Sequence, residues 1–462
     1  MSIITYVRAN WHAPQGYAEV LRVGLPLLAG MASIMVVQFT DRLFLSHYSM
    51  EAIAAVTPAS FAALTLYMTM FGVCSYTGVL TAQYVGARAP HKVGPAIWQG
   101  FWCTLLCAII LFTAGFFAEP FFALVGHEPE IQALETQYFS ITVLGAPIGL
   151  LSSSLAGFFY GRGLTKPVMF ANLLAAIINI PLDYALIFGA WGVPELGMRG
   201  AALATCLDWT STTLVLGLLA FNRENDREFH ILRGWRPDRE IFGKLLRYGL
   251  PSGINMFVEF AATSWFLFQL GGLGRIPQAA SNIAFSINSL SFMPTIGLNM
   301  ATAALVGQAM GRRAPLEAER ATRHALHLAS IYMLVAGALI IVFAAPLMEI
   351  FRTSSQLEQE SFEQVKATGV ILLYYVALYS QLDAPNLIFI GALKGAGDTV
   401  ATMKIIVGSV VLVLFMPMLV LHLSDSVGLH KLWIIFTVYI FSLALFAFLR
   451  FKGRRWHQIH MV

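Results

Sequence analysis

The sequence predicts an all-α membrane protein with twelve transmembrane helices in two parallel six-helix repeats around a central cleft. Composition is the first observation behind this class: 57% of the 462 residues are hydrophobic and 12% are charged, and the mean hydropathy is +0.69. A soluble domain would carry about twice that fraction of charge. Apolar runs of about 20 residues, enough to cross a bilayer as a helix, recur along the whole chain. The third observation is an internal repeat.

We expect twelve membrane spans, separated by breaks rich in glycine and proline. The spans cover about residues 19–45, 52–79, 94–118, 134–160, 167–190, 197–221, 242–270, 278–306, 322–349, 367–393, 400–422 and 428–449. The net charge of +4 is then a property of the loops between the spans, and it does not indicate a surface for nucleic acid.

Loop charges orient the predicted bundle. With a cytoplasmic N-terminus, 23 of the 29 Lys and Arg residues fall on the side of the two tails and the even-numbered loops, and six fall on the opposite side. Cytoplasmic loops of membrane proteins are enriched in Lys and Arg. We therefore expect a multi-pass protein of the prokaryotic inner membrane with both termini in the cytoplasm.

The chain repeats itself at an offset of 225 residues. Leu21-Arg22-Val23-Gly24-Leu25-Pro26 returns as Leu246-Arg247-Tyr248-Gly249-Leu250-Pro251. Gln83-Tyr84-Val85-Gly86-Ala87-Arg88-Ala89-Pro90 returns as Gln308-Ala309-Met310-Gly311-Arg312-Arg313-Ala314-Pro315. Because each half then holds an even number of spans, both halves enter the membrane from the same side and are parallel repeats.

The repeat predicts three domains. They are an N-terminal six-helix lobe at residues 1–221, a cytoplasmic interlobe linker at 222–241 and a C-terminal six-helix lobe at 242–462. The linker is polar and charged, as a connection between lobes should be. Two parallel lobes with a central cleft suggest a transporter that works by alternating access. A channel normally needs an oligomer or a pore-lining filter, and the sequence has no such signature. We expect a monomer.

Five carboxylates lie inside the predicted spans, where an acid costs about 2.5 to 3.5 kcal/mol and usually has a function. They are Asp41, Asp183, Asp208, Glu259 and Asp383. Counted along the helices at about 1.5 Å per residue, they fall into two layers. The acids of the first half lie in the outer part of the membrane, and those of the second half lie near the midplane.

The first candidate cation site contains Asp41, Asn179 and Asp183. Asn179 and Asp183 are four residues apart, so both side chains leave the helix from one face. Pro181 between them has no N–H to donate, which frees the carbonyl four residues earlier. Such oxygen-rich surroundings suit a hard cation such as Na+. Two alternatives remain open: Asn179 and Asp183 only satisfy neighbouring helices, or Asp41 only pairs with the arginine beside it.

The second candidate site contains Glu259, Tyr379 and Asp383. Tyr379 and Asp383 are four residues apart on one face, and Glu259 is expected at a similar depth on another helix. Two acids at one depth in a low dielectric need not both ionise, so one can hold a proton, and Na+ is the other candidate ligand. The alternative is a single shared-proton hydrogen bond with no role in transport.

Two further sets of polar or reactive side chains lie within the spans. Asp208 follows Thr205 by three residues, and a purely local hydrogen bond is one interpretation of it. All four cysteines lie in apolar spans, and Cys103 and Cys107 share a helix face. Since no His or carboxylate accompanies these two, we predict packing thiols and no metal site.

These residues together resemble the multidrug and toxic compound extrusion (MATE) family over nearly the whole chain. No one motif is unique, but the ordered set across both repeats is specific. The motifs are Leu25-Pro26 with Asp41, Val85-Gly86-Ala87, Asn179-Ile180-Pro181-Leu182-Asp183, Gly200-Ala201-Ala202-Leu203-Ala204-Thr205, Leu250-Pro251, Glu259, Tyr379 with Asp383, and Lys394-Gly395-Ala396-Gly397-Asp398-Thr399.

The resemblance implies a two-lobe antiporter that expels organic cations in exchange for Na+ or H+. The family's first-lobe cation site is matched by Asp41, Asn179, Asp183 and Thr205. The second-lobe site of its NorM-like branch is matched by Glu259, Tyr379 and Asp383, which the DinF-like branch usually lacks. Two departures are a loop at 191–199 that is a few residues longer than expected and Asp208, which has no counterpart in the family.

The leading functional hypothesis is a cation-coupled antiporter that exports lipophilic organic cations or other toxic compounds. A flippase for a lipid-linked saccharide is the alternative, but it would need several Arg or Lys in the cleft to hold a pyrophosphate, and we expect none at mid-membrane depth. No nucleophile–base or metal motif predicts an enzyme. We expect no cofactor besides the coupling ion Na+ or H+. The expected partners are small-molecule organic cations and the lipid bilayer, with no nucleic acid.

Overall fold

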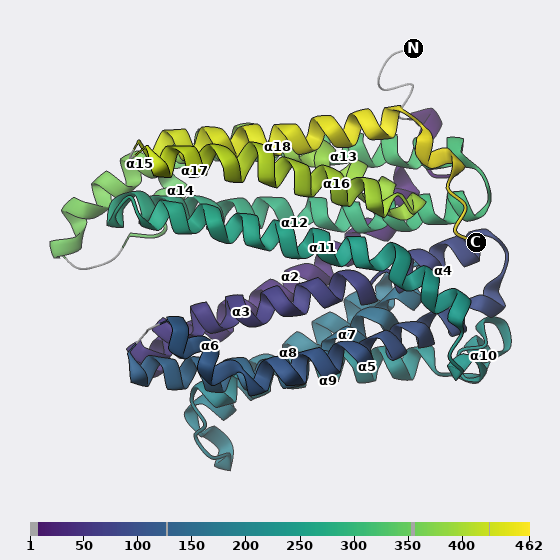
Figure 1. Cartoon of the computed structure of the whole chain (residues 1–462), viewed down its shortest axis with the longest axis horizontal. Helices are drawn as coiled ribbons and strands as arrows, with labels where there is room; N and C mark the ends of the chain where they lie inside the picture. Colours follow the sequence, from purple (N-terminus) through teal and green to yellow (C-terminus); the bar gives the residue numbers. More distant parts are fainter. Residues whose placement is uncertain (1–7, 126–127, 353–355, 425) are drawn as a thin grey trace. The chain divides into compact units, whose positions relative to one another are not determined.

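The computed structural model describes residues 8–125, 128–352, 356–424 and 426–462 (Figure 1). This part of the chain consists of helices, turns and loops and contains no β-strand. The prediction of an all-α protein is therefore confirmed.

The helices follow the predicted spans in order, with ends that differ by a few residues in most cases. Their bounds are α2 (Tyr17–Tyr48), α3 (Met50–Cys74), α4 (Thr77–Gly86), α5 (Val93–Phe116), α6 (Ala118–Val125), α7 (Pro129–Tyr160), α8 (Lys166–Phe188), α9 (Met198–Ala220), α10 (Arg223–Phe229), α11 (Arg239–Gly271), α12 (Arg275–Gly311), α13 (Pro315–Val342), α14 (Ala344–Glu349), α15 (Gln356–Ala396), α16 (Thr399–Ser409), α17 (Met416–Leu423) and α18 (Leu429–Lys452).

Eleven helical stretches in the described residues are long and apolar enough to cross a bilayer. Helix α11, the predicted seventh span, is not among them because it is more polar. It has 33 residues, so at about 1.5 Å per residue it is long enough to span. Its polar residues Ser252 and Asn255 are buried. Polar groups within membrane helices are tolerated where they face protein, so burial explains how this sequence remains helical at membrane depth.

Backbone contacts divide the chain into two compact units. The first unit contains Val23–Phe257, Gly307–Ala314 and His460–Val462. The second unit contains the N-terminal residues through Arg22, together with Val258–Val306 and Pro315–Ile459.

Helix α7 is the centre of the first unit. It packs against α3, α5 and α9, and α8 packs against α9. Two equivalent glycines of the repeat also belong to this unit. A Cβ on Gly86 would lie 2.1 Å from the carbonyl oxygen of Gln308, and a Cβ on Gly311 would lie 2.1 Å from that of Gln83. Only glycine permits backbones to approach this closely.

The predicted linker at 222–241 is folded onto the first unit. Asn222 caps α10 by accepting a hydrogen bond from the Asn225 backbone at 2.8 Å. The buried carboxylate of Asp226 accepts the backbone N–H of Leu232 at 2.8 Å. The Trp98 indole on α5 donates to the Ile231 carbonyl at 2.7 Å. The polar composition of this segment did not reveal these specific contacts.

Helix α15 is the centre of the second unit. It packs against α13 and α18, and α16 packs against α18, the yellow helix of Figure 1. The core contains Phe266, Tyr379, Trp433 and Phe436, all buried. The Phe266 and Phe436 rings lie 4.6 Å apart. Aromatic side chains bury large areas, so this cluster fixes α11, α15 and α18 against one another.

The eleventh predicted span contains a wide turn. Helices α16 and α17 are joined by a π-helical turn, Val410–Phe415, after which the Met416 N–H donates to the carbonyl of Val411, five residues earlier. Pro417 follows directly. An α-helical turn would press the proline ring against the carbonyl of Val413, and the wider turn relieves that clash.

Candidate functional site

The structure brings the predicted residues of the first candidate site together. We name Asp41, Asn179, Asp183 and Thr205 the first acid cluster; all four belong to the first unit. They come from α2, α8 and α9. The carboxylates of Asp41 and Asp183 are close enough to interact electrostatically. The Asn179 amide donates to the Ala204 carbonyl at 2.9 Å, which holds α8 against α9 next to Thr205.

Local sequence explains how α8 presents its polar side chains. Asn179 and Asp183 lie one helical turn apart and both are buried, at 3% and 1% exposure. Pro181 lies within the helix, so it donates no backbone hydrogen bond at this level. The helix ends at Gly189, whose φ of 70° is left-handed and favours glycine.

Two residues beside the first acid cluster, Tyr138 and Ser60, were not predicted from the sequence. The hydroxyl of Tyr138 on α7 forms side-chain hydrogen bonds with Ser60 on α3 and with Thr205, and it interacts electrostatically with Asp41 and Asp183. Tyr138 thereby connects three helices at the cluster. A polar side chain buried within an apolar span was the available signal, but Ser and Tyr are too common in such spans for it to be selective.

Oxygen atoms of the first acid cluster are left without partners. Both carboxylate oxygens of Asp183 and one of Asp41 are buried and have no hydrogen-bond partner among the described residues. A buried polar atom without a partner is costly, and two carboxylates near each other repel. One bound cation, or a proton on one carboxylate, would relieve both costs. The donor set therefore fits a hard cation such as Na+ as well as a proton.

The residues of the second candidate site also lie together. We name Glu259, Tyr379 and Asp383 the second acid cluster; α11 supplies the first and α15 the other two, and all belong to the second unit. Glu259 and Asp383 interact electrostatically. The Asn386 amide donates to Asp383 Oδ1 at 3.0 Å. Asn386 is three residues from Asp383 on one helix face, so the spacing could have indicated it.

A lysine lies near the second acid cluster, contrary to the expectation that no Lys or Arg would be found at mid-membrane depth. Lys394, in the last turn of α15, interacts electrostatically with Glu259. In the sequence, Lys394 directly follows the predicted span at 367–393. Side chains of a helix point back toward its N-terminus, and the lysine stem is long, so its charge reaches deeper than its Cα.

Aromatic side chains surround the second acid cluster. The Tyr379 ring meets Phe436 edge-on with ring centroids 5.5 Å apart. Tyr439 on α18 interacts electrostatically with both Glu259 and Asp383. The buried Tyr379 hydroxyl has no hydrogen-bond partner in the described part of the chain. The second acid cluster, with Tyr439 and Lys394 beside it, thus brings two carboxylates, two phenols and one ammonium together within an apolar core.

Asp208 lies outside the first acid cluster. It is on α9 and interacts electrostatically with Tyr67 on α3. The Tyr67 ring stacks on Trp209 at 5.1 Å. The Thr205 hydroxyl donates to the Ala201 carbonyl at 3.2 Å.

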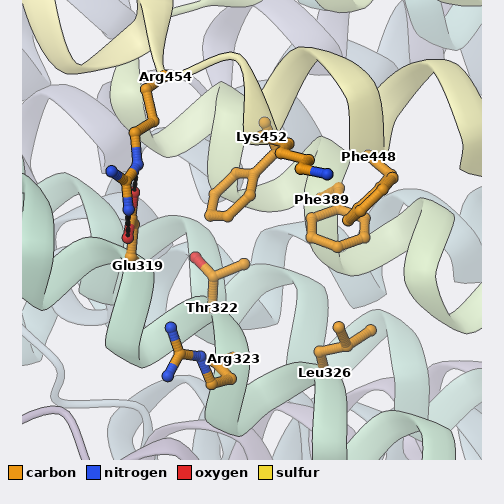
Figure 2. Close-up of a pocket in the computed structure, with 9 residues that line it drawn as sticks. Glu319, Thr322, Arg323, Leu326, Phe389, Phe448, Lys452 and Arg454 are labelled. Carbon is orange, nitrogen blue, oxygen red and sulfur yellow. Dashed lines mark hydrogen bonds and ion pairs between the residues drawn. The ribbon is translucent and has the colours of Figure 1, made fainter.

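A separate cavity of about 510 Å³ lies in the second unit (Figure 2). It is lined by the first turns of α13, the end of α18 and Phe389 of α15. Its walls include the basic residues Arg323, Lys452 and Arg454. It contains none of the predicted site residues.

The fold and the paired acid clusters define a multi-pass, all-α membrane protein with carboxylates buried inside its spans. A sequence model of the MatE family matches residues 26–185 and 251–419. The chain belongs to this family of membrane transporters. Every predicted site residue except Thr205 lies within the two matched segments.

Curated relatives agree with this assignment. The chain is 28% identical over 390 residues to the multidrug resistance protein PmpM of Pseudomonas aeruginosa, covering 83% of this chain and 80% of the relative. It is 26% identical over 446 residues to a probable multidrug resistance protein NorM of Bradyrhizobium diazoefficiens, covering 96% and 94%.

A solved structure has the same fold. An outward-facing multidrug resistance MATE family transporter of the MOP superfamily superposes with a TM-score of 0.85 at 22% sequence identity, and 97% of each chain is covered. At this identity the likeness concerns the fold alone.

Proposed function

We propose that this protein is a multidrug efflux antiporter that exports lipophilic organic cations, or other toxic compounds, in exchange for Na+ or H+ by alternating access. The names of its relatives, multidrug resistance proteins PmpM and NorM, support export of diverse compounds. Membership of the MatE family supports a transporter. The proposed location is the prokaryotic inner membrane, with both termini in the cytoplasm and a monomer as the working form.

Unpartnered carboxylate oxygens inside the spans carry this proposal. Asp183 has two such oxygens and Asp41 has one within the described residues, and the two acids interact. Buried charges are normally paired or coordinate metals. Acids that lack a protein partner at membrane depth suit a ligand that supplies positive charge and then leaves.

Exchange follows from competition for the same carboxylates. A cationic cargo and a coupling ion would each relieve the Asp41–Asp183 repulsion, and each would do so by occupying the same carboxylate oxygens. Binding of one then weakens binding of the other, and by linkage the effect is reciprocal. After the cargo leaves on one side of the membrane, the ion would take its place at the carboxylates. An antiporter requires such an exchange of one ligand for the other.

A flippase for a lipid-linked saccharide is less well supported. A pyrophosphate is best held by several Arg or Lys side chains in fixed geometry. Among the described residues, two cations interact with the acid clusters: Lys394 with Glu259, and Arg42 with Asp41 beside it in the sequence. The acids outnumber the cations there, which favours positively charged cargo.

Reconstitution into liposomes tests the proposal. Efflux of a fluorescent lipophilic cation would be followed with a Na+ gradient alone, a pH gradient alone, or neither. We expect at least one gradient to accelerate efflux severalfold. Asp183→Asn and Asp383→Asn each remove one acid with little change in shape, so each should lower gradient-driven efflux sharply.

Asp208→Asn is the matched control, because it neutralises a membrane acid outside both clusters. It should keep most of the gradient-driven efflux. Efflux that is unchanged in both cluster variants would refute the role of the carboxylates. Equal losses in all three variants would show that neutralising any membrane acid disrupts the protein, which would also contradict the assignment.

A further inference from the structure

Three buried cysteines meet in the first unit. Cys74 is the last residue of α3, and Cys103 and Cys107 lie one turn apart on α5. All three Sγ atoms lie within 4.8 Å of one another. Their side chains are 0%, 3% and 8% exposed, and all are free thiols. The sequence had indicated only the α5 pair, because nothing in the spacing places Cys74 opposite it.

The fourth cysteine offers a comparison. Cys206 on α9 is also a free thiol, and its Sγ lies 3.6 Å from the Ile141 carbonyl. It does not belong to the three-thiol group. Cysteine packing alone therefore accounts for Cys206, but it does not require three thiols from two helices to converge on one point.

The arrangement fits one central atom with three sulfur ligands. Thiolates lie about 2.3 Å from a bound ion such as Zn2+, so three of them in a plane around it are about 4.0 Å apart. The observed upper limit of 4.8 Å requires only small changes in the side-chain torsions. Soft thiolate ligands select soft, thiophilic partners and disfavour hard cations such as Na+ and Mg2+.

The net charge of the three thiolates together with the bound atom distinguishes between the possible thiophilic ligands. No His, Asp, Glu or further Cys belongs to the group in the described residues. Three thiolates with Cu+ or Zn2+ would leave net negative charge in an apolar core, which is costly when nothing nearby neutralises it. Three thiolates with a trivalent centre are neutral.

We propose that Cys74, Cys103 and Cys107 form a binding site for one trivalent thiophilic metalloid, arsenic(III) or antimony(III). Arsenous acid is neutral and small. Its three hydroxyl groups leave as water with the three thiol protons, and three As–S bonds form, so the reaction is As(OH)3 + 3 RSH → As(SR)3 + 3 H2O. No oxidant, reductant or net charge is required.

Ligation would connect α3 to α5 through a covalent bridge. Helix α3 also carries Ser60, which hydrogen-bonds to Tyr138 beside the first acid cluster. A bridge at the end of α3 would restrain this helix, so we expect the metalloid to inhibit transport. The inhibition rests on the proposed function, whereas the binding itself does not.

Binding is tested with reduced, purified full-length protein and sodium arsenite. After desalting, bound arsenic is measured by elemental analysis, and its ligands are identified by X-ray absorption. We expect one arsenic per chain with three sulfur neighbours. Cys74→Ser, Cys103→Ser and Cys107→Ser should each lower retention by about tenfold or more, equivalent to about 1.4 kcal/mol. Cys206→Ser should bind like the wild type.

Three outcomes would overturn the proposal. The first is equal retention by Cys74→Ser, because binding would then need only the α5 pair. The second is two-sulfur coordination in the wild type. The third is tighter retention of Zn2+ or Cu+ than of arsenic in a competition series.

Cys74→Ala serves as a second variant if the serine variant misfolds, and loss of binding in a folded Cys74→Ala protein supports the site. Binding without inhibition would leave the site standing and contradict only its effect on transport.

The cavity in the second unit is a second candidate binding site. The cavity of Figure 2 is lined by aromatic and by basic side chains. The Phe389 ring lies 5.6 Å from Phe448 and 5.1 Å from Phe451. Lys452 Nζ lies 5.8 Å from the centre of the Phe448 ring. The cavity therefore offers apolar contact beside positive charge.

The basic residues of this cavity differ in their pairing. Arg454 is held by Glu319 through two hydrogen bonds of 2.7 and 3.0 Å. Arg323 and Lys452 are exposed, and within the described residues neither forms an ion pair. The cavity lies at the start of α13 and the end of α18, the side predicted to face the cytoplasm. Basic pockets between helices on this side suit anionic lipid headgroups.

We infer that this cavity binds one anionic phospholipid of the inner leaflet, with the phosphate between Arg323 and Lys452 and an acyl chain along Phe389 and Phe448. Delipidated protein would be titrated with phosphatidylglycerol or phosphatidylcholine and followed by native mass spectrometry. A parallel arm uses inorganic phosphate. We expect phosphatidylglycerol to bind several times more tightly than phosphatidylcholine, and phosphate to bind weakly.

The double variant Arg323→Gln with Lys452→Gln should remove the preference for phosphatidylglycerol. Arg320→Gln, an exposed arginine of α13 that does not line the cavity, should keep it. An unchanged preference in the double variant would overturn the inference, and so would equal binding of both lipids by the wild type. Tight binding of inorganic phosphate would assign the cavity to a soluble anion instead.

Discussion

Gly86 and Gly311 occupy equivalent positions of the 225-residue repeat and pack in equivalent ways. Each lies against the carbonyl oxygen of the glutamine that precedes the other glycine by three residues, at 2.1 Å from where a Cβ would be. Glycine has no Cβ, so it permits the backbone to approach this closely at both positions. The symmetric packing explains why the sequence carries glycine at both positions.

The first prediction concerns this packing. Gly86→Ala and Gly311→Ala should each destabilise the protein by about 1–3 kcal/mol, because the added methyl group must displace backbone. The measurement is the thermal unfolding temperature in detergent. Gly243→Ala is the control, since that glycine of α11 has nothing within 4 Å of the added Cβ. The control should be neutral or stabilising by up to about 1 kcal/mol. Equal behaviour of all three would contradict the close approach.

The second prediction separates the two acid clusters. Asp41→Asn should mimic neutralisation of the first acid cluster, because it removes the charge that interacts with Asp183. Cargo affinity should fall, and its dependence on Na+ and pH should be lost. Cargo binding to purified wild type and variant would be measured across Na+ and pH series, with Asp208→Asn as the control. A variant that keeps the wild-type dependence on both ions would assign coupling to Glu259 and Asp383.

The third prediction concerns the ion pair that joins α16 to α18. Arg450 donates to both oxygens of Asp398, at 2.6 and 3.0 Å, and Asp398 is buried. Asp398→Asn leaves the guanidinium without its counter-charge and should cost about 3 kcal/mol of stability. Glu240→Gln, which breaks the exposed pair with Lys244, should leave the stability almost unchanged, because water and salt screen such a pair. Chemical unfolding of the two variants should therefore differ clearly, and a similar small effect in both would contradict the structural role of Asp398.

The fourth prediction tests sidedness. Glu195 and Arg233 lie in loops that the charge pattern assigns to opposite faces, and both are exposed. In cells, Glu195→Cys should react with a membrane-impermeant maleimide added outside, whereas Arg233→Cys should react only after permeabilisation. The native cysteines are mostly buried and should give little background. Labelling of both variants from one face would overturn the predicted topology.

The helical spans could be predicted well from the sequence because the length of an apolar run is a local property. The run at residues 167–190 became α8, Lys166–Phe188, with a shift of one or two residues. Spacing of four residues likewise identified Asn179 with Asp183 and Tyr379 with Asp383. These relations depend on a single helix, whose geometry is known before the fold is.

Contacts between side chains on different helices could not be predicted from the sequence in the same way. Tyr138, Ser60 and Cys74 join their clusters through packing, and no fixed spacing in the chain connects them to Asp41 or Cys103. The Cα of Lys394 lies just beyond its predicted span, but the reach of its side chain toward Glu259 depends on how α15 packs against α11. Breaks within spans, such as the one between α3 and α4, also depend on packing.

The π-helical turn Val410–Phe415 sets the angle between the two halves of the eleventh span. A turn closed by a bond to the fifth residue holds about one residue more than an α-helical turn, so the side chains of α17 are rotated by about 100° from a straight continuation of α16. A row of residues that continues one face of α16 by α-helical spacing therefore points in a different direction on α17. Deleting one residue from Val410–Phe415 would restore a single helical phase but would bring the Pro417 ring against a carbonyl. The length of this span is thus fixed by its proline as well as by the thickness of the bilayer.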